Sequence, residues 1–389
     1  MVVCLAIAFI IKYDTRQIEM LVFLIFNQFL LSFILYLRSN LSGLHLFKTD
    51  SFISVLDRLL MIGICAILLW GHITSVSFQI EWFVYSQTAA YLITAIITLL
   101  IVMRKAGFFK LNFDRNFFIV FLKQSYPFAL LILLMAFYNR IDSVMLERLL
   151  PNGDEEAGIY AQSYRILDAA SMISFLFAGL LLPIFSKMLK NKEPVHQLVQ
   201  FSYRLIIVPA IIFVVGAVIY APQLMKLLYH GNDLYYSATI FACIIPGLIA
   251  ISTTYIYGTL LTANGKLRQL NIMAASAMII NITLNYILIP HFQALGSAIS
   301  SLTTQTLTAL IQILIANQVF SIKPNWKFIS MLIVFSAGIV GVGILVKYTF
   351  DSWFLGFLLI GIVGIIAAFA LKLIDFKGIY HIIKNRDED

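Results

Sequence analysis

One uncharged stretch constrains the fold of this chain more than any other feature of its sequence. Between Gln269 and Ile322 there is no Lys, Arg, Asp or Glu. A helix crosses the ~30 Å hydrocarbon layer of a membrane with roughly 20 apolar residues, so this stretch is too long for one span. The sequence Pro-His-Phe-Gln at 290–293 divides it into two. The stretch therefore predicts two membrane helices joined by a very short turn.

The composition extends this conclusion to the whole chain. Hydrophobic residues make up 61% of the 389 residues, charged residues only 12%, and the mean hydropathy is +0.93. Soluble proteins are closer to half apolar and a quarter charged, so lipid has to be the solvent for most of this surface. We predict an all-α polytopic membrane protein.

Hydropathy predicts eleven full spans and a partial span before them. The full spans are residues 20–37, 54–72, 82–102, 125–146, 158–185, 204–222, 238–261, 272–290, 296–319, 329–346 and 353–371. The apolar stretch 2–11 is half a span long and has no basic segment before it, which disfavours a secretory signal peptide. We interpret it as part of a first helix, and expect that upstream sequence is missing or that the start was assigned late.

The distribution of Lys and Arg predicts the orientation. Outside the spans, alternate connections carry eighteen of these residues on one side and five on the other. Because basic loops stay in the cytoplasm, the richer side is predicted to be cytoplasmic, and it includes the carboxy-terminus. Basic loops against anionic lipid headgroups account for the net charge of +8, so no nucleic-acid partner is expected.

Four charged residues, Arg140, Asp142, Arg165 and Asp168, lie deep inside two neighbouring predicted spans. An ionised group at mid-bilayer costs about 2.5–3.5 kcal/mol on insertion scales, so four unpaired groups would cost on the order of 10 kcal/mol. Counted outward from the turn between the spans, Arg140 and Asp168 lie within ~5 Å of each other along the helix axes, as do Arg165 and Asp142. The four residues either clamp the two helices together or face a polar cavity. We favour the cavity, because intramembrane charges usually mark a pathway.

Other polar residues in the spans allow more than one interpretation. Asp57 and Arg58 lie one turn inside the cytoplasmic end of their helix, where they are either a wet mouth or an interfacial anchor. Arg204 lies at a helix end, from which its side chain can reach the interface. Asn281 and Asn285 are one turn apart, and we interpret them as hydrogen-bonding contacts between helices rather than as substrate contacts.

Several kinds of catalytic sequence are absent. The chain contains no P-loop, H-E-x-x-H, G-x-S-x-G or C-x-x-C motif, and no outward loop is long enough for a catalytic domain. The cysteines Cys4, Cys65 and Cys243 fall in apolar segments, which predicts neither a disulfide framework nor a metal site. We therefore expect a transporter rather than an enzyme, with no bound cofactor.

The residues around the charged pair of spans carry a family resemblance. They read YNRIDSVML at 138–146, AGIYAQSYRILD at 157–168 and LPIFSK at 182–187. Together they resemble the seventh and eighth helices of the bacterial polysaccharide (O-antigen type) flippases, which belong to the multidrug/oligosaccharidyl-lipid/polysaccharide exporter superfamily. LTANGK at 261–266 and ALGSA at 294–298 fit the same family.

The resemblance implies a fold and a division of the chain. Members of the family have fourteen helices, arranged as two six-helix lobes around a central cavity plus a final pair. This chain is similar to them from about the third helix to the end. We accordingly expect residues 1–124 to be an amino-terminally truncated remnant of the first lobe. Residues 125–319 would be the second lobe, and residues 320–389 the final two helices and a cytoplasmic tail.

The function implied by the resemblance is translocation of an undecaprenyl-pyrophosphate-linked oligosaccharide across the bacterial inner membrane by alternating access. The guanidinium groups of Arg140 and Arg165 suit an anionic pyrophosphate, which cannot cross hydrocarbon unaided. Asp142 and Asp168 would hold these arginines in place or couple transport to a proton or cation gradient.

The remaining candidate substrate contacts come from three places in the sequence. Asp57 and Arg58 would help at the cytoplasmic mouth. Tyr138 and Tyr164, with Tyr160, are predicted to stack on sugars. Asn139, between Tyr138 and Arg140, belongs to the same predicted site.

Three other functions stay open at this stage. A cell-wall lipid precursor flippase and a cation-coupled drug antiporter belong to the same superfamily, and the antiporter would prefer acidic residues in its cavity. A non-transporting scaffold in a polysaccharide assembly complex is the third. Expected partners are the lipid-linked oligosaccharide and membrane lipids, with a polysaccharide polymerase and chain-length machinery as further candidates.

Overall fold

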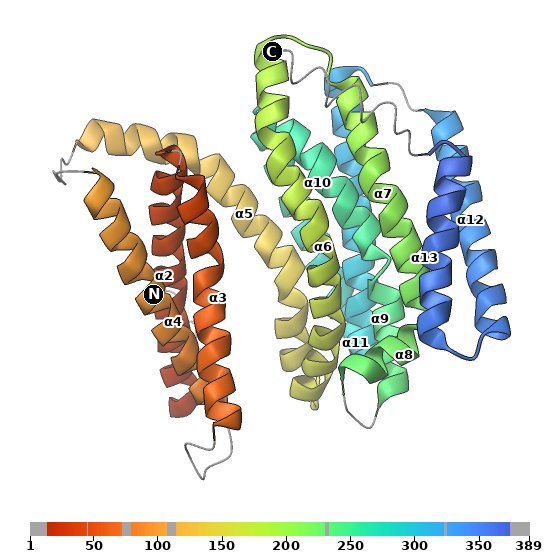
Figure 1. The fold of residues 1–389 in the computed structure, drawn as a ribbon, viewed down its shortest axis with the longest axis horizontal. Helices are drawn as coiled ribbons and strands as arrows, with labels where there is room; N and C mark the ends of the chain where they lie inside the picture. The colour runs from red at the N-terminus through yellow and green to blue at the C-terminus, as the bar shows by residue number, and fades with distance from the viewer. Residues whose placement is uncertain are drawn as a thin grey trace. The chain divides into compact units, whose positions relative to one another are not determined.

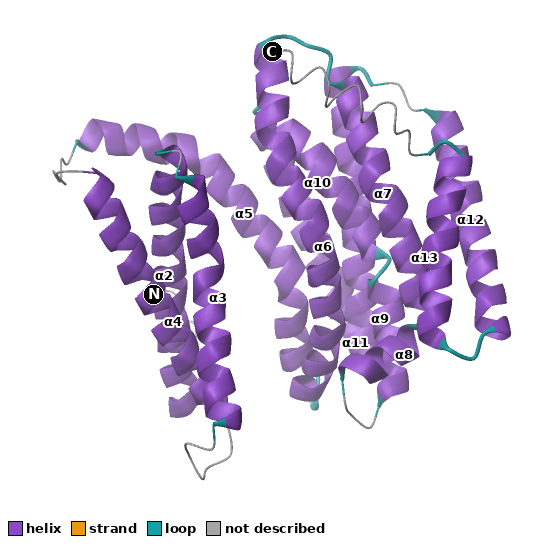
Figure 2. Ribbon diagram, viewed as in Figure 1, coloured by secondary structure: helices purple, strands orange, loops and turns teal. Residues whose placement is uncertain are grey.

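The computed structural model of the chain describes residues 14–44, 46–71, 79–106, 114–229, 233–322 and 325–373 (Figure 1). Every regular element in these residues is an α-helix (Figure 2). The predicted partial span at 2–11 lies outside the described residues. The helices fall into two compact units, residues 1–114 and 115–389. The predicted division into two lobes and a final pair of helices stays a prediction.

The described residues of the first unit form three helices, red to orange in Figure 1. These are α2 (Thr15–Gly43), α3 (Phe47–Trp70) and α4 (Ile80–Ala106). Helix α4 packs against both α2 and α3, around a core that includes the fully buried Leu41 and Ile53. An ion pair between Arg38 Nε and Asp50 Oδ1, 2.6 Å apart, joins α2 to the first turn of α3.

The second unit holds the other helices formed by described residues. They are α5 (Arg115–Leu149), α6 (Gly153–Lys190), α7 (His196–Ile219), α8 (Ala221–Leu228), α9 (Leu234–Ile244), α10 (Gly247–Ala263), α11 (Leu267–Phe320), α12 (Trp326–Thr349) and α13 (Trp353–Ala370). Helix α11 packs along α5 and α10, and α10 packs along α6. Helices α12 and α13 both pack on α7.

Two breaks divide long apolar stretches of this unit. Pro246 separates α9 from α10, because proline has no N–H to continue the helical hydrogen bonding. In α11 the break is at Gln293, where φ is 52° and ψ is −132°. A straight helix of its 54 residues would be ~81 Å long, far more than a membrane is thick. Helix α11 is therefore two spans, divided where the Pro-His-Phe-Gln sequence predicts.

The prediction of an all-α membrane protein is confirmed. Ten helices in the described residues are long and apolar enough to cross a membrane, counting α9 with α10 as one and the whole of α11 as one. The predicted span 238–261 corresponds to α9 and α10 together, and each of the other ten overlaps a described helix or one half of α11. The chain is a multi-pass membrane protein.

Some helix ends differ from the prediction. Helix α5 begins at Arg115 rather than at 125, and α6 covers 153–190 rather than 158–185. Hydropathy detects only the apolar middle of a helix, whereas backbone hydrogen bonds continue through its charged ends. The eight-residue α8 was not predicted, since it is too short to be a span.

Candidate substrate-binding site

One of the two predicted ion pairs joins α5 to α6. Arg140 Nη2 lies 2.7 Å from Asp168 Oδ2, which confirms this part of the prediction. The side chains of Arg140 and Asp168 are 65% and 41% exposed, so the pair lies at the surface of the second unit. The Arg140 guanidinium also lies over the ring of Tyr164, 5.1 Å from its centroid. A guanidinium has five N–H donors, so most of those of Arg140 remain available to a ligand.

The second predicted pair, between Arg165 and Asp142, is wrong. Asp142 is completely buried and accepts two hydrogen bonds of 2.6 Å, from the Tyr160 hydroxyl to Oδ2 and from Asn285 Nδ2 to Oδ1. Each residue of a helix is rotated by about 100° from the one before it, so residues 140 and 142 point to nearly opposite sides of α5. Arg140 therefore lies at the surface while Asp142 faces α11, and equal depth along the axis does not bring Asp142 to Arg165.

A small network of neutral groups surrounds Asp142. Asn285 Nδ2 also donates to Asn281 Oδ1 over 3.1 Å, and the Ser297 hydroxyl donates to Asn285 Oδ1 over 3.0 Å. All of these side chains are fully buried. The network links α5 to both halves of α11, which supports the interpretation of Asn281 and Asn285 as contacts between helices.

Arg165 lies on the exposed face of α6, next in sequence to the buried Tyr164. Within the described part of the chain, no carboxylate forms an ion pair with Arg165. Its neighbour one turn on, Asp168, pairs with Arg140 instead. Two guanidinium groups of adjacent helices are therefore exposed at this site, and one carboxylate partly neutralises them.

The aromatic residues of the predicted site are buried. Tyr138, Tyr160 and Tyr164 are 4%, 1% and 5% exposed. The rings of Tyr160 and Tyr164 are 5.6 Å apart and tilted by 38°. In this conformation Tyr160 orients Asp142 and Tyr164 supports Arg140, and none of the three rings presents a free face to a sugar. Asn139 is half-buried beside Tyr138.

Asp57 and Arg58 lie on α3, in the first unit. Asp57 is buried and Arg58 is exposed. Their placement at a cytoplasmic mouth stays a prediction.

One buried acid was not anticipated. The sequence places Glu156 in a short acidic turn, but its side chain is 5% exposed. Glu156 Oε2 accepts hydrogen bonds from the backbone N–H of Ala294, at 3.0 Å, and from the Tyr236 hydroxyl, at 2.9 Å. Ala294 directly follows the break in α11 and begins a new helix, whose first N–H groups have no helical partner. Acidic residues are common in a first helical turn, so the sequence does not distinguish Glu156 from Asp154 and Glu155.

Comparison with protein families gives a partial match. Residues 1–189 match the model of the family described as polysaccharide biosynthesis protein. The match includes the helices α5 and α6 that carry Arg140 and Asp168, and the predicted resemblance is confirmed. No curated protein sequence matches the chain.

Solved structures share the fold at low sequence identity. The chain is similar to the lipid II flippase MurJ in an inward closed conformation, with 16% identity over 91% of this chain and 73% of that one, at a TM-score of 0.64. An inward-facing MATE-family multidrug resistance transporter of the MOP superfamily shares 12% identity over 82% of this chain and 75% of that one, at 0.66. An outward-facing structure of a transporter from that family shares 14% sequence identity with this chain. The match covers 78% of this chain and 70% of that one, at a TM-score of 0.60. The chain therefore has the fold of MOP-superfamily transporters.

Proposed function

We propose that this chain is a flippase for an undecaprenyl-pyrophosphate-linked oligosaccharide, an O-antigen, capsule or exopolysaccharide unit. It would move this substrate from the cytoplasmic to the outer leaflet of the bacterial inner membrane by alternating access. The observation that carries the proposal is the pair of exposed guanidinium groups, Arg140 and Arg165, inside membrane spans of a transporter fold. The family description, polysaccharide biosynthesis protein, supports a sugar-bearing substrate.

The chemistry of the site suits a pyrophosphate. Arginine binds phosphate oxygens through two parallel N–H groups, and such charge-assisted bonds are strong in a site shielded from water. Arg165 is available without breaking an ion pair to a described residue, whereas Arg140 would exchange Asp168 for the ligand. Asp168 then limits how tightly the headgroup is held, which a transporter needs if it is to release its substrate.

The buried Asp142 is the best candidate for coupling to an ion gradient. The hydrogen-bond donors to Asp142 described above are neutral, and they leave the negative charge of its carboxylate uncompensated. A proton or a monovalent cation that binds there would neutralise this charge. Because its donors come from α6 and from α11, such neutralisation would change the contacts between three helices. An Asp142→Asn variant, which carries no charge at this position, should lose the dependence of transport on the gradient.

The proposal is tested in proteoliposomes that contain the full chain and a fluorescent undecaprenyl-pyrophosphate-linked oligosaccharide. Replacing either arginine with Gln should lower the initial flipping rate about tenfold, as expected for lost charge-assisted hydrogen bonds. The matched control is Arg148→Gln, an exposed position near the end of α5, which should flip at the wild-type rate. Equal losses of protein and of transport in the two Gln variants would instead mean that the arginines only clamp the helices.

The same vesicles discriminate the other functions. If a lipid-linked cell-wall precursor or a cationic drug moved faster than the oligosaccharide, that compound would be the substrate instead. No movement of any of the three would favour a scaffold. Asp57, Arg58, Tyr138, Asn139 and Tyr164 are further proposed contacts, to be tested one by one in this assay.

The proposed orientation and partners need separate measurements. A reporter that is active only outside the cytoplasm, fused to the carboxy-terminus, should be inactive in cells. A polysaccharide polymerase and chain-length machinery would receive the translocated unit, and crosslinking in membranes should capture them.

A further inference from the structure

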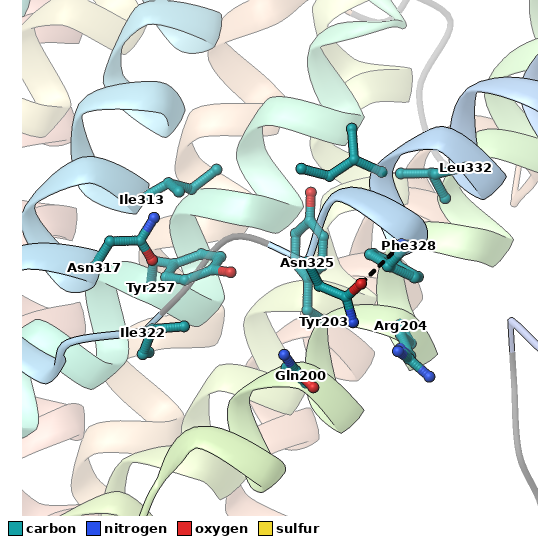
Figure 3. Close-up of a pocket in the computed structure, with 11 residues that line it drawn as sticks. Gln200, Tyr203, Arg204, Tyr257, Ile313, Asn317, Ile322, Asn325, Phe328 and Leu332 are labelled. Carbon is teal, nitrogen blue, oxygen red and sulfur yellow. Dashed lines mark hydrogen bonds between the residues drawn. The ribbon is translucent and has the colours of Figure 1, made fainter.

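A pocket lies away from the charged face of α5 and α6, in the second unit. It has a volume of about 220 Å³ and is formed where α7 and α12 begin and α11 ends, with one residue from α10 (Figure 3). The residues that line it are Gln200, Tyr203, Arg204, Tyr257, Ile313, Asn317, Ile322, Asn325, Phe328, Ile329 and Leu332. Because these residues come from helix ends, the pocket lies at the depth where membrane helices meet lipid headgroups.

Arg204 is the charged residue of this pocket. Its guanidinium lies over the ring of Phe328, 4.7 Å from the centroid, and the side chain is half-buried. Among the described residues, no acidic residue lines the pocket and no carboxylate forms an ion pair with Arg204. With one face of the guanidinium on an aromatic ring, its N–H groups point outward in the plane and are free to bind an oxyanion.

The rest of the pocket wall is amphipathic. Gln200, Asn317 and Asn325 supply carboxamides, and Asn325 Oδ1 already accepts from the backbone N–H of Phe328 over 3.0 Å. The rings of Tyr203 and Tyr257 meet edge to face at 5.7 Å.

The apolar part of the lining comes from Ile313, Ile322, Ile329 and Leu332. Such a wall accommodates a group that is polar at one end and joined to hydrocarbon at the other.

We infer that this pocket binds the phosphodiester headgroup of an anionic glycerophospholipid such as phosphatidylglycerol. A single guanidinium matches the single negative charge of a phosphodiester. A zwitterionic headgroup would add an ammonium group, for which the described lining residues offer no carboxylate. The volume is below the roughly 300–1,000 Å³ of sites for drug-sized ligands, so it admits a headgroup and excludes an oligosaccharide. Basic pockets between membrane helices commonly hold lipid headgroups.

The test uses native mass spectrometry of the full chain in detergent, titrated with phosphatidylglycerol and with phosphatidylcholine. Wild-type protein should retain phosphatidylglycerol at least about tenfold better, and Arg204→Gln should remove this preference, as expected for a lost charge-assisted interaction. Arg204→Lys should restore part of it. The matched control is Arg268→Gln, which removes an exposed charge near the start of α11, outside the pocket, and should leave the preference within about twofold of wild type.

Several outcomes would overturn the assignment. Equal retention of the two lipids by the wild-type protein would do so without any variant, which matters if Arg204→Gln does not fold. An equal effect of the Arg204 and Arg268 substitutions would show that net charge alone attracts the lipid. Displacement of the lipid by glycerol phosphate at equal concentration would mean that the ligand is a soluble phosphate ester.

Discussion

The two sides of α5 show how one helix can carry charge for two different purposes. Arg140 is largely exposed and pairs with a half-exposed Asp168, whereas Asp142, two residues on, is completely buried among neutral donors. Charged groups at a surface can exchange partners at little cost, but a buried charge depends on every hydrogen bond that it receives. The exposed side is therefore suited to binding a ligand that comes and goes, and the buried side to holding helices in register.

The largest effect expected from this comparison is on Asp142. Asp142→Ala leaves the buried donors of Tyr160 and Asn285 without their acceptor, and should destabilise the protein by about 2–5 kcal/mol. Thermal unfolding of the purified protein in detergent measures the loss. Arg140→Ala, on the opposite side, should cost less than about 1 kcal/mol. Equal losses in the two variants would refute the distinction between the two sides.

A second test compares a buried acidic residue with an exposed one at the start of α6. Glu156→Gln removes the charge that holds Ala294 N–H and Tyr236, and should destabilise the protein by about 1–3 kcal/mol. Glu155→Gln, at the exposed neighbouring position, is the control and should change stability by less than about 0.5 kcal/mol. Thermal unfolding of both variants measures these changes in stability. If Glu156→Gln left the stability unchanged, the break in α11 would not need this carboxylate.

The role of the exposed side is tested by removing Asp168, which competes with the ligand for Arg140. Asp168→Asn frees the Arg140 guanidinium, so the chain should bind the pyrophosphate lipid about tenfold tighter and release it more slowly. Equilibrium binding to the fluorescent lipid, measured beside flipping rates, would reveal tighter binding with slower turnover. Weaker binding would show that Asp168 positions Arg140 rather than competing for it.

The smallest effect on stability is expected at Arg165. Arg165→Gln should change the unfolding free energy by less than about 0.5 kcal/mol, because the side chain is exposed and pairs with no described carboxylate. Flipping by the same variant is expected to fall, as proposed above. A large loss of stability would place Arg165 among the residues that hold the helices together.

The positions of the spans could be predicted because hydropathy is a property of the local sequence. The division of the 269–322 stretch at Pro290 to Gln293 appears in the structure as the backbone break at Gln293. The pairing of Arg140 with Asp168 was also predictable, since the depth of a residue in a helical hairpin follows from its distance to the turn. The partner of Asp142 was not, because depth does not say which side of the helix a residue occupies.

By itself, then, the sequence determined that this is a helical membrane protein, where its spans lie, and that α5 and α6 carry unusual intramembrane charge. Only the tertiary structure decided which of those charges are buried. Packing of α11 against α5 encloses Asp142 and supplies Asn285 as its hydrogen-bond donor. At the break in α11, the N–H of Ala294 donates to Glu156, whose side chain is buried. These contacts join residues more than a hundred positions apart, and they depend on how helices rotate against one another, which no local pattern in the sequence specifies.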